Sequence, residues 1–416
     1  MNPVFAQPPI LDEQQRAGST LRPLRGGVLL ATDFPPLEGG ISNYLFNIYR
    51  QFDLRWMTVV APQHPQAAQF DSRQQYFARR FAVAPNVPGI RGAWQLCRMR
   101  QEAEKLASGR NDVVLHCGHV NAAIAARSVK RRHGTPYLVW TYALEVMDEW
   151  LRSKILPALL DADLVITISD FTRDFLLRAG VAAVRIVKIR PGTDPLRFRP
   201  GMDSAPLAYR LGVAGRPTLL TVSRIVKANR YKGHDFVLRA LPRVVREVPE
   251  LMYLIVGEGD DLPYLRRLAD ECGVSRNVVF AGRVSDAELP LLYNLCDVFI
   301  MCSREERTRR GLLAEGFGIS FAEASACAKP VIAGRSGGVG DAVLHDVTGL
   351  LVDPTDAEQT AAAILRLLRE REVAAKLGQN GRLWVRSELS WERAGHEFQA
   401  AMERFFPGEF SWMGAS

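Results

Sequence analysis

The stretch PTLLTVSRIVKANRYKGHDFVLRALPRVVREVPELMYLIVGEG (217–259) decides the fold class of this chain. Residues 218–222 and 251–256 are almost continuous apolar runs, which is typical of strands that are buried on both faces of a sheet. Between them, residues 234–248 repeat apolar side chains at helical spacing. A strand, a helix and another strand in this order predict a parallel βαβ unit.

The same alternation extends over most of the chain. Strand-like runs precede this stretch at 26–34, 56–62, 112–118, 136–142 and 162–169, and follow it at 277–282, 297–303 and 330–334. Prolines and glycines cluster at 191–205 and break the rhythm once, as a linker does. We therefore predict an α/β protein made of two doubly wound, Rossmann-like domains that face a central cleft. The expected parts are a loose extension (1–25), an N-terminal domain (26–195), a C-terminal domain (196–389) and a final amphipathic helix (390–406).

Composition is that of an ordinary globular protein. The 416 residues are 47% hydrophobic and 24% charged, which suffices for two cores. No apolar run approaches the ~18 residues of a membrane span. The polar, proline-rich start lacks the apolar core of a signal peptide, so we expect a cytoplasmic location.

Net charge is distributed unevenly. The formal charge is +8, and all of this excess lies in residues 1–190, with basic clusters at 77–81, 91–100 and 128–134. Either this is a solvated basic surface or it marks an anionic partner. Nucleic acid is disfavoured because no aromatic-interleaved basic stripe is present, so the partner we expect is anionic lipid on the inner face of the plasma membrane.

The segment EGFGISFAE (315–323) carries two carboxylates that are separated by seven residues. It follows a predicted strand and begins a helix, whose N-terminal amides favour a phosphate. Gly316 and Gly318 let the backbone approach a ligand. Glu315 and Glu323 are placed to bind the two polyol ends of that ligand, as in a nucleotide sugar. Taken singly, one carboxylate could be a helix cap and the other an exposed helical residue.

Cations cluster after the strand at 218–222. Arg224 and Lys232 lie between that strand and the next helix, where they could offset the charge of a diphosphate. Either one alone could be a surface cation, and Lys227 and Arg230 are close enough to compete for the same role.

Three further strand ends carry weaker signals. Gly39 and Gly40 follow the first strand, Gly257 ends the strand at 251–256, and Val284 follows the strand at 277–282. We include all four among the expected donor-binding residues. Since no G-x-G-x-x-G follows a strand, a double-Rossmann oxidoreductase is disfavoured.

Together these motifs resemble the retaining glycosyltransferases of family 4, which have the GT-B fold. The resemblance covers residues 26–405 and rests on DFPP with GGI (33–41), EGFGISFAEA (315–324), VIAGRSGG (331–338) and TGLLVDP (348–354). The branch most similar in these motifs contains phosphatidylinositol mannosyltransferases and bacterial polysaccharide mannosyltransferases.

The resemblance implies a role for each matching residue. Arg224 and Lys232 would bind the donor diphosphate, and Glu323 would bind the ribose. Glu315, with the backbone of the segment that contains Gly316, Phe317, Gly318 and Ile319, would bind the donor sugar. Gly39 and Gly40 would adjoin the phosphates or the acceptor, and the helix around Trp391 would cross back to brace the first domain.

One departure from the family pattern matters. Where the family often has T-H-G-H-E, this chain has TYALE (141–145), so Tyr142 occupies the histidine position. Its hydroxyl could donate a hydrogen bond to the donor sugar, which would place Tyr142 beside Glu315, Arg224 and Lys232 in the catalytic set. Alternatively it is a packing aromatic, and the protein is a non-catalytic nucleotide-sugar-binding or scaffold protein of the same fold.

The resemblance also implies the reaction. A sugar, which we expect to be mannose from GDP-mannose, would pass with retention to a hydroxyl of a lipid-linked or polysaccharide acceptor. The leaving phosphate would take the acceptor proton. No D-x-D motif stands at the expected site, so we expect no metal and no other cofactor. A phosphorylase would need a cofactor lysine, for which no motif is present.

Overall fold

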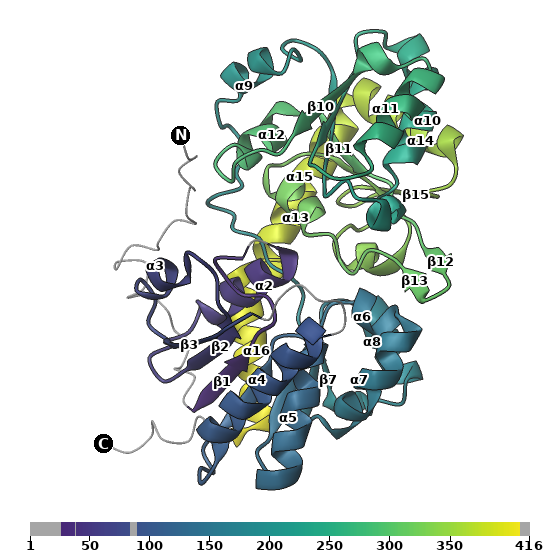
Figure 1. Ribbon diagram of the computed structural model, residues 1–416. Helices are drawn as coiled ribbons and strands as arrows, with labels where there is room; N and C mark the ends of the chain where they lie inside the picture. The colour runs from purple at the N-terminus through teal and green to yellow at the C-terminus, as the bar shows by residue number, and fades with distance from the viewer. Residues whose placement is uncertain (1–25, 38, 84–89, 408–416) are drawn as a thin grey trace. The chain divides into compact units, whose positions relative to one another are not determined.

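Figure 1 shows the computed structural model, which describes residues 26–37, 39–83 and 90–407. The described residues form two compact units. The N-terminal unit comprises the residues up to Pro191, with Arg309–Gly311 and the chain from Trp391 onward; the C-terminal unit comprises Gly192–Thr308 and Leu312–Ser390. The expected extension (1–25) lies outside the described residues.

The N-terminal unit is built on a parallel sheet. Within the described residues it has seven strands in the order β3-β2-β1-β4-β5-β6-β7. They are β1 (Gly27–Leu30), β2 (Thr58–Pro62), β3 (Phe77–Phe81), β4 (Val114–Cys117), β5 (Tyr137–Thr141), β6 (Leu164–Thr167) and β7 (Ile186–Lys188). The helices are α2 (Gly40–Tyr49), α3 (Ala67–Asp71), α4 (Ile90–Ala107), α5 (Val120–His133), α6 (Leu144–Met147), α7 (Glu149–Asp161), α8 (Asp170–Arg178) and α16 (Trp391–Phe405). The order reverses between β1 and β4, where a doubly wound sheet binds its ligand.

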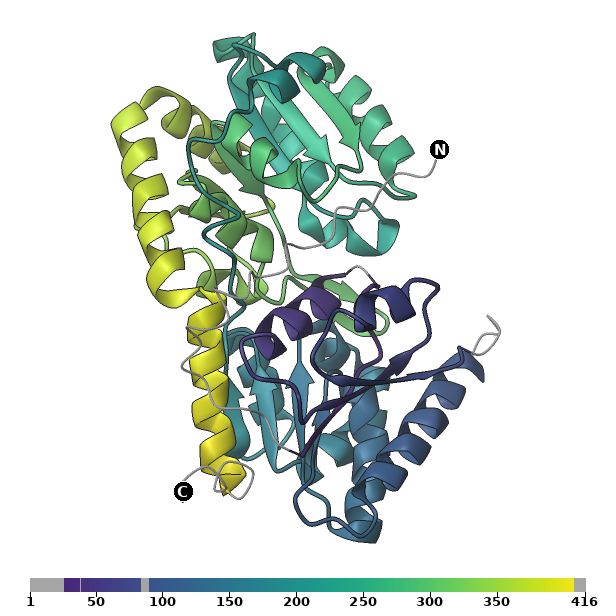
Figure 2. The ribbon, with the colours of Figure 1, turned by 90° about the vertical axis from the view of Figure 1, so that its left-hand side faces the viewer.

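Helix α16 closes one face of this sheet. Figure 2 shows it, at the yellow end of the colour bar, running along the N-terminal unit. Phe398 packs at 5.2–5.7 Å from the rings of Trp140, Tyr49 and Phe52, and Trp391 lies 5.6 Å from Tyr44. Helices α4, α5 and α7 contribute their apolar residues to the core on the other face.

The C-terminal unit repeats the same topology. Its larger sheet, within the described residues, has the parallel order β10-β9-β8-β11-β14-β15. The strands are β8 (Thr218–Val222), β9 (Met252–Val256), β10 (Val278–Gly282), β11 (Val298–Met301), β14 (Val331–Gly334) and β15 (Leu350–Val352). The helices are α9 (Ala205–Arg210), α10 (His234–Glu247), α11 (Leu262–Glu271), α12 (Leu289–Leu295), α13 (Ile319–Ala326), α14 (Ala357–Arg369) and α15 (Arg371–Glu388), with short 3₁₀ turns that include η2 (Lys227–Lys232). Here the order reverses between β8 and β11.

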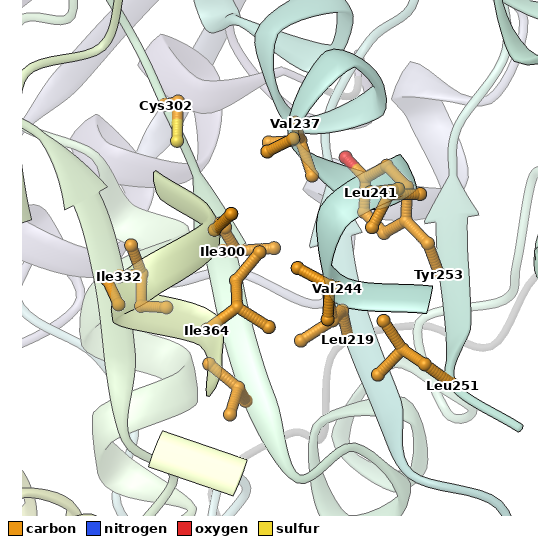
Figure 3. Close-up of a cluster of buried hydrophobic side chains, with 14 of the residues drawn as sticks. Leu219, Val237, Leu241, Val244, Leu251, Tyr253, Ile300, Cys302, Ile332 and Ile364 are labelled. Carbon is orange, nitrogen blue, oxygen red and sulfur yellow. The ribbon is translucent and has the colours of Figure 1, made fainter. Parts of the chain in front are cut away.

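Alternation along the strands places the core of this unit. Figure 3 shows Leu219, Tyr253 and Ile300 from the sheet meeting Leu241 and Val244 of α10. Ile364 of α14 completes the same layer. Phe299 points to the opposite face, because successive strand residues alternate, and meets Tyr293 and Phe321 there. Helices α12 and α13 therefore cover the face opposite α10.

The expected α/β fold class is confirmed, although three strands and a hairpin were not foreseen. β3 has the sequence FARRF, and its two arginines are more typical of an exposed surface segment than of a strand. An edge strand tolerates such charges because it is paired on one side only. β7 and β15 are each only three residues long, which is too short for a clear strand pattern, and β15 lies within the TGLLVDP motif (348–354). Between β11 and α13, residues 306–313 form the two-stranded sheet β12 (Glu306–Thr308) and β13 (Gly311–Leu313).

No helix in the described part of the chain has the length and apolarity that crossing a membrane requires.

Candidate functional site

Candidate site residues from two connections lie at the carboxyl ends of the C-terminal sheet. Arg224 lies in the connection that follows β8, and Glu315 lies in the connection between β11 and α13. Gly233, which follows η2, has φ 77, and a Cβ there would lie 1.8 Å from the carbonyl oxygen of Cys302. This close approach of two backbones brings Lys232, which precedes Gly233, next to the end of β11.

Lys232 and Glu315 form an ion pair. Nζ of Lys232 lies 2.7 Å from Oε2 of Glu315, and the two side chains are only 16% and 13% exposed. Burial by itself lowers the pKa of Lys232, but the charge of Glu315 and the hydroxyl of Tyr231 outweigh that effect, so the pKa lies above its usual value. The lysine is thus fixed as a cation at this strand end.

The start of α13 presents backbone amides beside this pair. Gly318 is the N-cap residue with φ 93, which an L side chain rarely adopts, and a Cβ there would lie 2.4 Å from the ring of Phe321. Phe317 is buried, whereas Gly316 and Ile319 are half-buried. The carbonyl of Glu315 accepts from the amide of Gly338 at 2.8 Å, which fixes the segment before the helix. An anion at this helix start is favoured by the orientation of its free amides.

Glu323 lies further along α13 and differs electrostatically from Glu315. Its Oε2 accepts a hydrogen bond from the hydroxyl of Tyr293 at 2.6 Å. Burial raises the pKa of Glu323 to about 7, and Tyr293 and Arg197 act against that rise. Glu323 is therefore a half-buried carboxyl group that changes charge near neutral pH.

The cations that follow β8 separate into two kinds. Arg230 is held by both oxygens of Asp261, at 2.6 and 2.7 Å, and stacks 4.1 Å from the ring of Tyr264, so it has a structural role. Arg224 is exposed and, among the described residues, makes no ion pair. Lys227 is exposed as well. Arg224 and Lys227 therefore remain the candidates for the cation that binds the donor diphosphate, and Arg230 does not.

Gly257 has a local structural explanation, whereas Val284 is placed only by its position after β10. A Cβ on Gly257, whose φ is 138, would lie 1.8 Å from the carbonyl oxygen of Ser223, so the glycine lets two strand ends approach each other. Val284 is half-buried in the loop after β10. The donor-binding role of each stays a prediction.

In the N-terminal unit, Gly39 and Gly40 begin α2 directly after the β1 connection. Gly39 is the N-cap residue, and a Cβ on either glycine would meet nothing within 4 Å. Packing among the described residues therefore does not require glycine at either position, and a contact with the ligand stays a prediction.

The TYALE segment follows β5 and is held by its glutamate. Glu145 is buried, and its carboxylate accepts from the amides of both Tyr142 and Ala143. Ala143 has φ 137 and occupies the glycine position of the family motif T-H-G-H-E. A non-glycine residue in this conformation costs on the order of 1–3 kcal/mol, and the two hydrogen bonds to the glutamate hold the backbone in it. The loop thus keeps a strained shape although its histidine is replaced.

Tyr142 makes two contacts from this loop. Its hydroxyl donates to the carbonyl of Gly118 at 2.9 Å, and its ring lies parallel to that of His119 at 6.4 Å. Burial and the neighbouring Tyr44 and Glu145 raise the pKa of Tyr142 well above its usual value, so the hydroxyl stays protonated. His119 caps α5 with Nδ1 accepting from the amide of Asn121, so a proton on the neutral ring lies on Nε2.

Tyr293, Glu145 and His119 were not assigned to the site from the sequence. Tyr293 stands in an apolar helical stretch, and its partner lies on another helix thirty positions away, so no spacing indicates the contact. Glu145 could have been assigned from the sequence, because it matches the final glutamate of the family motif T-H-G-H-E.

Comparison with known proteins decides the family. The model of the glycosyl transferases group 1 matches residues 211–384, and that of Glycosyltransferase Family 4 matches residues 38–197. A GDP-mannose-dependent alpha-(1-6)-phosphatidylinositol monomannoside mannosyltransferase of Mycobacterium tuberculosis (strain ATCC 25618 / H37Rv) is 34% identical over 374 residues, covering 88% of this chain and 94% of the relative. This chain belongs to the family 4 glycosyltransferases. It is therefore a glycosyltransferase enzyme, as the motifs led us to expect.

Other relatives and solved structures agree. A GDP-mannose-dependent monoacylated alpha-(1-6)-phosphatidylinositol monomannoside mannosyltransferase of Corynebacterium glutamicum is 30% identical, covering 89% of this chain and 96% of the relative. The crystal structure of Anabaena Alr3699/HepE in complex with UDP and glucose matches with a TM-score of 0.75 and 19% identity, over 91% of this chain and 99% of that one. Sucrose-phosphate synthase from Thermosynechococcus elongatus matches at 0.74 and 22%, over 92% and 99%. These structures confirm the GT-B fold.

Proposed function

We propose that this glycosyltransferase moves mannose from GDP-mannose, with retention, to a hydroxyl of a phosphatidylinositol-mannoside-like glycolipid. The mannosyltransferase relatives, which are 30–34% identical over most of their length, support the donor and the acceptor class. The observation that carries the chemistry is the Lys232–Glu315 ion pair beside the N-terminus of α13. The half-buried Lys232 cation, the amides at the start of α13 and the carboxylate that we propose for the sugar lie close together at these strand ends.

Each group has one task in this proposal. Lys232, Arg224 and the amides of α13 offset the negative charge that grows on the leaving diphosphate. Glu315 binds hydroxyls of the sugar, and Glu323 binds those of the ribose. The bond from the anomeric carbon to the phosphate oxygen breaks, the acceptor oxygen bonds to the same face of that carbon, and the acceptor proton passes to the leaving phosphate.

Tyr142 serves this reaction as a neutral hydrogen-bond donor. Its protonated hydroxyl would turn from the carbonyl of Gly118 to a hydroxyl of the donor sugar. A Tyr142→Phe variant separates this role from packing, because it keeps the ring against Tyr44 and His119. We expect kcat/KM to fall about tenfold, which is the loss that one hydrogen bond of this kind produces. Unchanged kinetics would leave Tyr142 as a packing aromatic.

We also propose that the transfer needs no metal ion. Among the described residues, no group of three or more histidine, cysteine, aspartate or glutamate side chains is arranged to hold one. The diphosphate charge would instead be offset by Lys232 and Arg224. Transfer that EDTA abolishes and magnesium or manganese restores would refute this.

Contact with an anionic membrane is the remaining part of the proposal. The net positive charge of residues 1–190 supports it, since basic side chains are attracted to anionic lipid headgroups. Binding to phosphatidylglycerol vesicles should exceed binding to phosphatidylcholine vesicles, and should weaken as salt is raised. Equal binding to both at low salt would contradict the contact.

Donor titration tests the central claim. Calorimetry with GDP-mannose, UDP-glucose, UDP-N-acetylglucosamine and ADP-glucose should show micromolar binding of GDP-mannose, which Glu323→Ala weakens. Transfer to a phosphatidylinositol mannoside then tests the acceptor. Tight binding of a different donor would overturn the choice of GDP-mannose, and donor binding without turnover would point to the non-catalytic protein.

A further inference from the structure

The contact between α12 and α13 is more specific than helix packing requires. Tyr293 is fully buried, and its ring packs edge-on to Phe198 at 5.8 Å and at a tilt to Phe299 at 5.6 Å. These contacts aim its hydroxyl at Glu323, where it donates to Oε2 at 2.6 Å. A phenylalanine would fill the same space, so the packing alone does not explain the hydroxyl.

The other oxygen of the carboxylate is available. Among the described residues, Oε1 of Glu323 accepts no hydrogen bond, whereas Oε2 is held by Tyr293. Glu323 is half-buried, so its side chain is partly accessible. A ribose presents two neighbouring hydroxyl donors, and a carboxylate with one oxygen fixed meets them in a single orientation.

We propose that Tyr293 is a positioning residue, whose hydroxyl orients the carboxylate of Glu323 for the ribose of the nucleotide-sugar donor. This inference rests on the proposed function of Glu323. It adds a residue that does not touch the donor itself and acts through the carboxylate.

The charges around the pair make the hydroxyl matter near neutral pH. The pKa of Glu323 is raised to about 7, because burial and the charge of Asp286 raise it more than Tyr293 and Arg197 lower it. Arg197 is itself engaged with Asp286, donating to its carbonyl at 2.7 Å.

Two thiols also neighbour the pair. Burial raises the pKa of Cys296 and of Cys327 to about 12, so both are neutral near pH 7. Burial raises the pKa of Tyr293 well above its usual value, so its hydroxyl is a close neutral donor that favours the charged carboxylate.

The test compares Tyr293→Phe with the wild type in GDP-mannose calorimetry from pH 5.5 to 9. We expect the dissociation constant of the variant to rise about tenfold at pH 7, with kcat nearly unchanged. The pH midpoint below which binding weakens should shift upward by about one unit, because the carboxyl group loses a hydrogen bond to its charged form. Loss of packing alone would not move that midpoint.

Two further variants make the result decisive. In a Glu323→Gln background, Tyr293→Phe should change affinity little, since there is no carboxylate left to orient. Tyr253→Phe is the matched control: it removes another buried tyrosine hydroxyl, bonded to Thr221 in the same unit, and should keep the wild-type midpoint.

Two outcomes would overturn the inference: a wild-type affinity and midpoint in Tyr293→Phe, or an equal loss of affinity with and without Glu323. If the wild type itself bound no GDP-mannose, the proposed function would fail first, and the two failures are thus distinguishable.

Discussion

Replacement of Lys232 by methionine tests the ion pair on which the donor site depends. The change keeps most of the length of the side chain and removes its charge, which leaves Glu315 without its partner at 2.7 Å. Losing one member of a buried pair destabilises a protein by about 3–5 kcal/mol. The two side chains retain 16% and 13% exposure, so solvent screens part of the interaction and we expect about 2–3 kcal/mol.

A double-mutant cycle measures this energy. Lys232→Met, Glu315→Gln and the double variant are compared by amide hydrogen exchange of β8 and β11, which reports the opening of the C-terminal unit by itself. Because the double variant leaves no unpaired charge, its loss should be smaller than the sum of the single losses by about 1.5 kcal/mol or more. Single losses that add within about 0.5 kcal/mol would refute the coupling.

Three other changes probe the same switch point. Lowering the pH below about 7 should weaken donor binding by up to about tenfold per pH unit, because Glu323, whose pKa is raised to about 7, loses its charge; a Glu323→Gln titration should be flat, and an equally steep one would contradict the assignment. Gly318→Ala should cost about 1–3 kcal/mol in urea unfolding and weaken donor binding, since φ is 93 and the new Cβ would meet Phe321; unchanged stability would show that the turn relaxes. Arg224→Gln should weaken donor binding about tenfold while stability stays within about 0.5 kcal/mol, because the side chain is exposed; unaltered affinity would leave Lys227 as the phosphate-binding cation.

Local patterns in the sequence predicted the two sheets and the strand ends at which the candidate site residues lie. The apolar runs at 218–222 and 251–256 are unambiguous, because strands buried on both faces must be apolar throughout. Since parallel strands end at one edge, Lys232 and Glu315 could be expected near each other, and the structure pairs them. Their roles toward a donor stay predictions.

Features that depend on tertiary contacts were not predictable. β3 carries two arginines, and its strand conformation comes from pairing with β2. The close approach of Gly257 to the carbonyl of Ser223 requires glycine at this position, and no local pattern indicated that contact; its role toward a donor stays a prediction. The raised pKa of Glu323 comes from burial that no sequence window contains.

Helix α16 has a consequence for how the protein is made on the ribosome. The N-terminal unit cannot be completed by residues 26–191 alone, since Phe398 fills its cluster of Tyr49, Phe52 and Trp140. At about 5–20 residues per second, translating the intervening C-terminal unit takes roughly 10–40 seconds. For that interval the nascent N-terminal sheet exposes an aromatic face. We infer that this face is a target for chaperones, and that the C-terminal unit, though encoded later, is the first to have all of its sequence available.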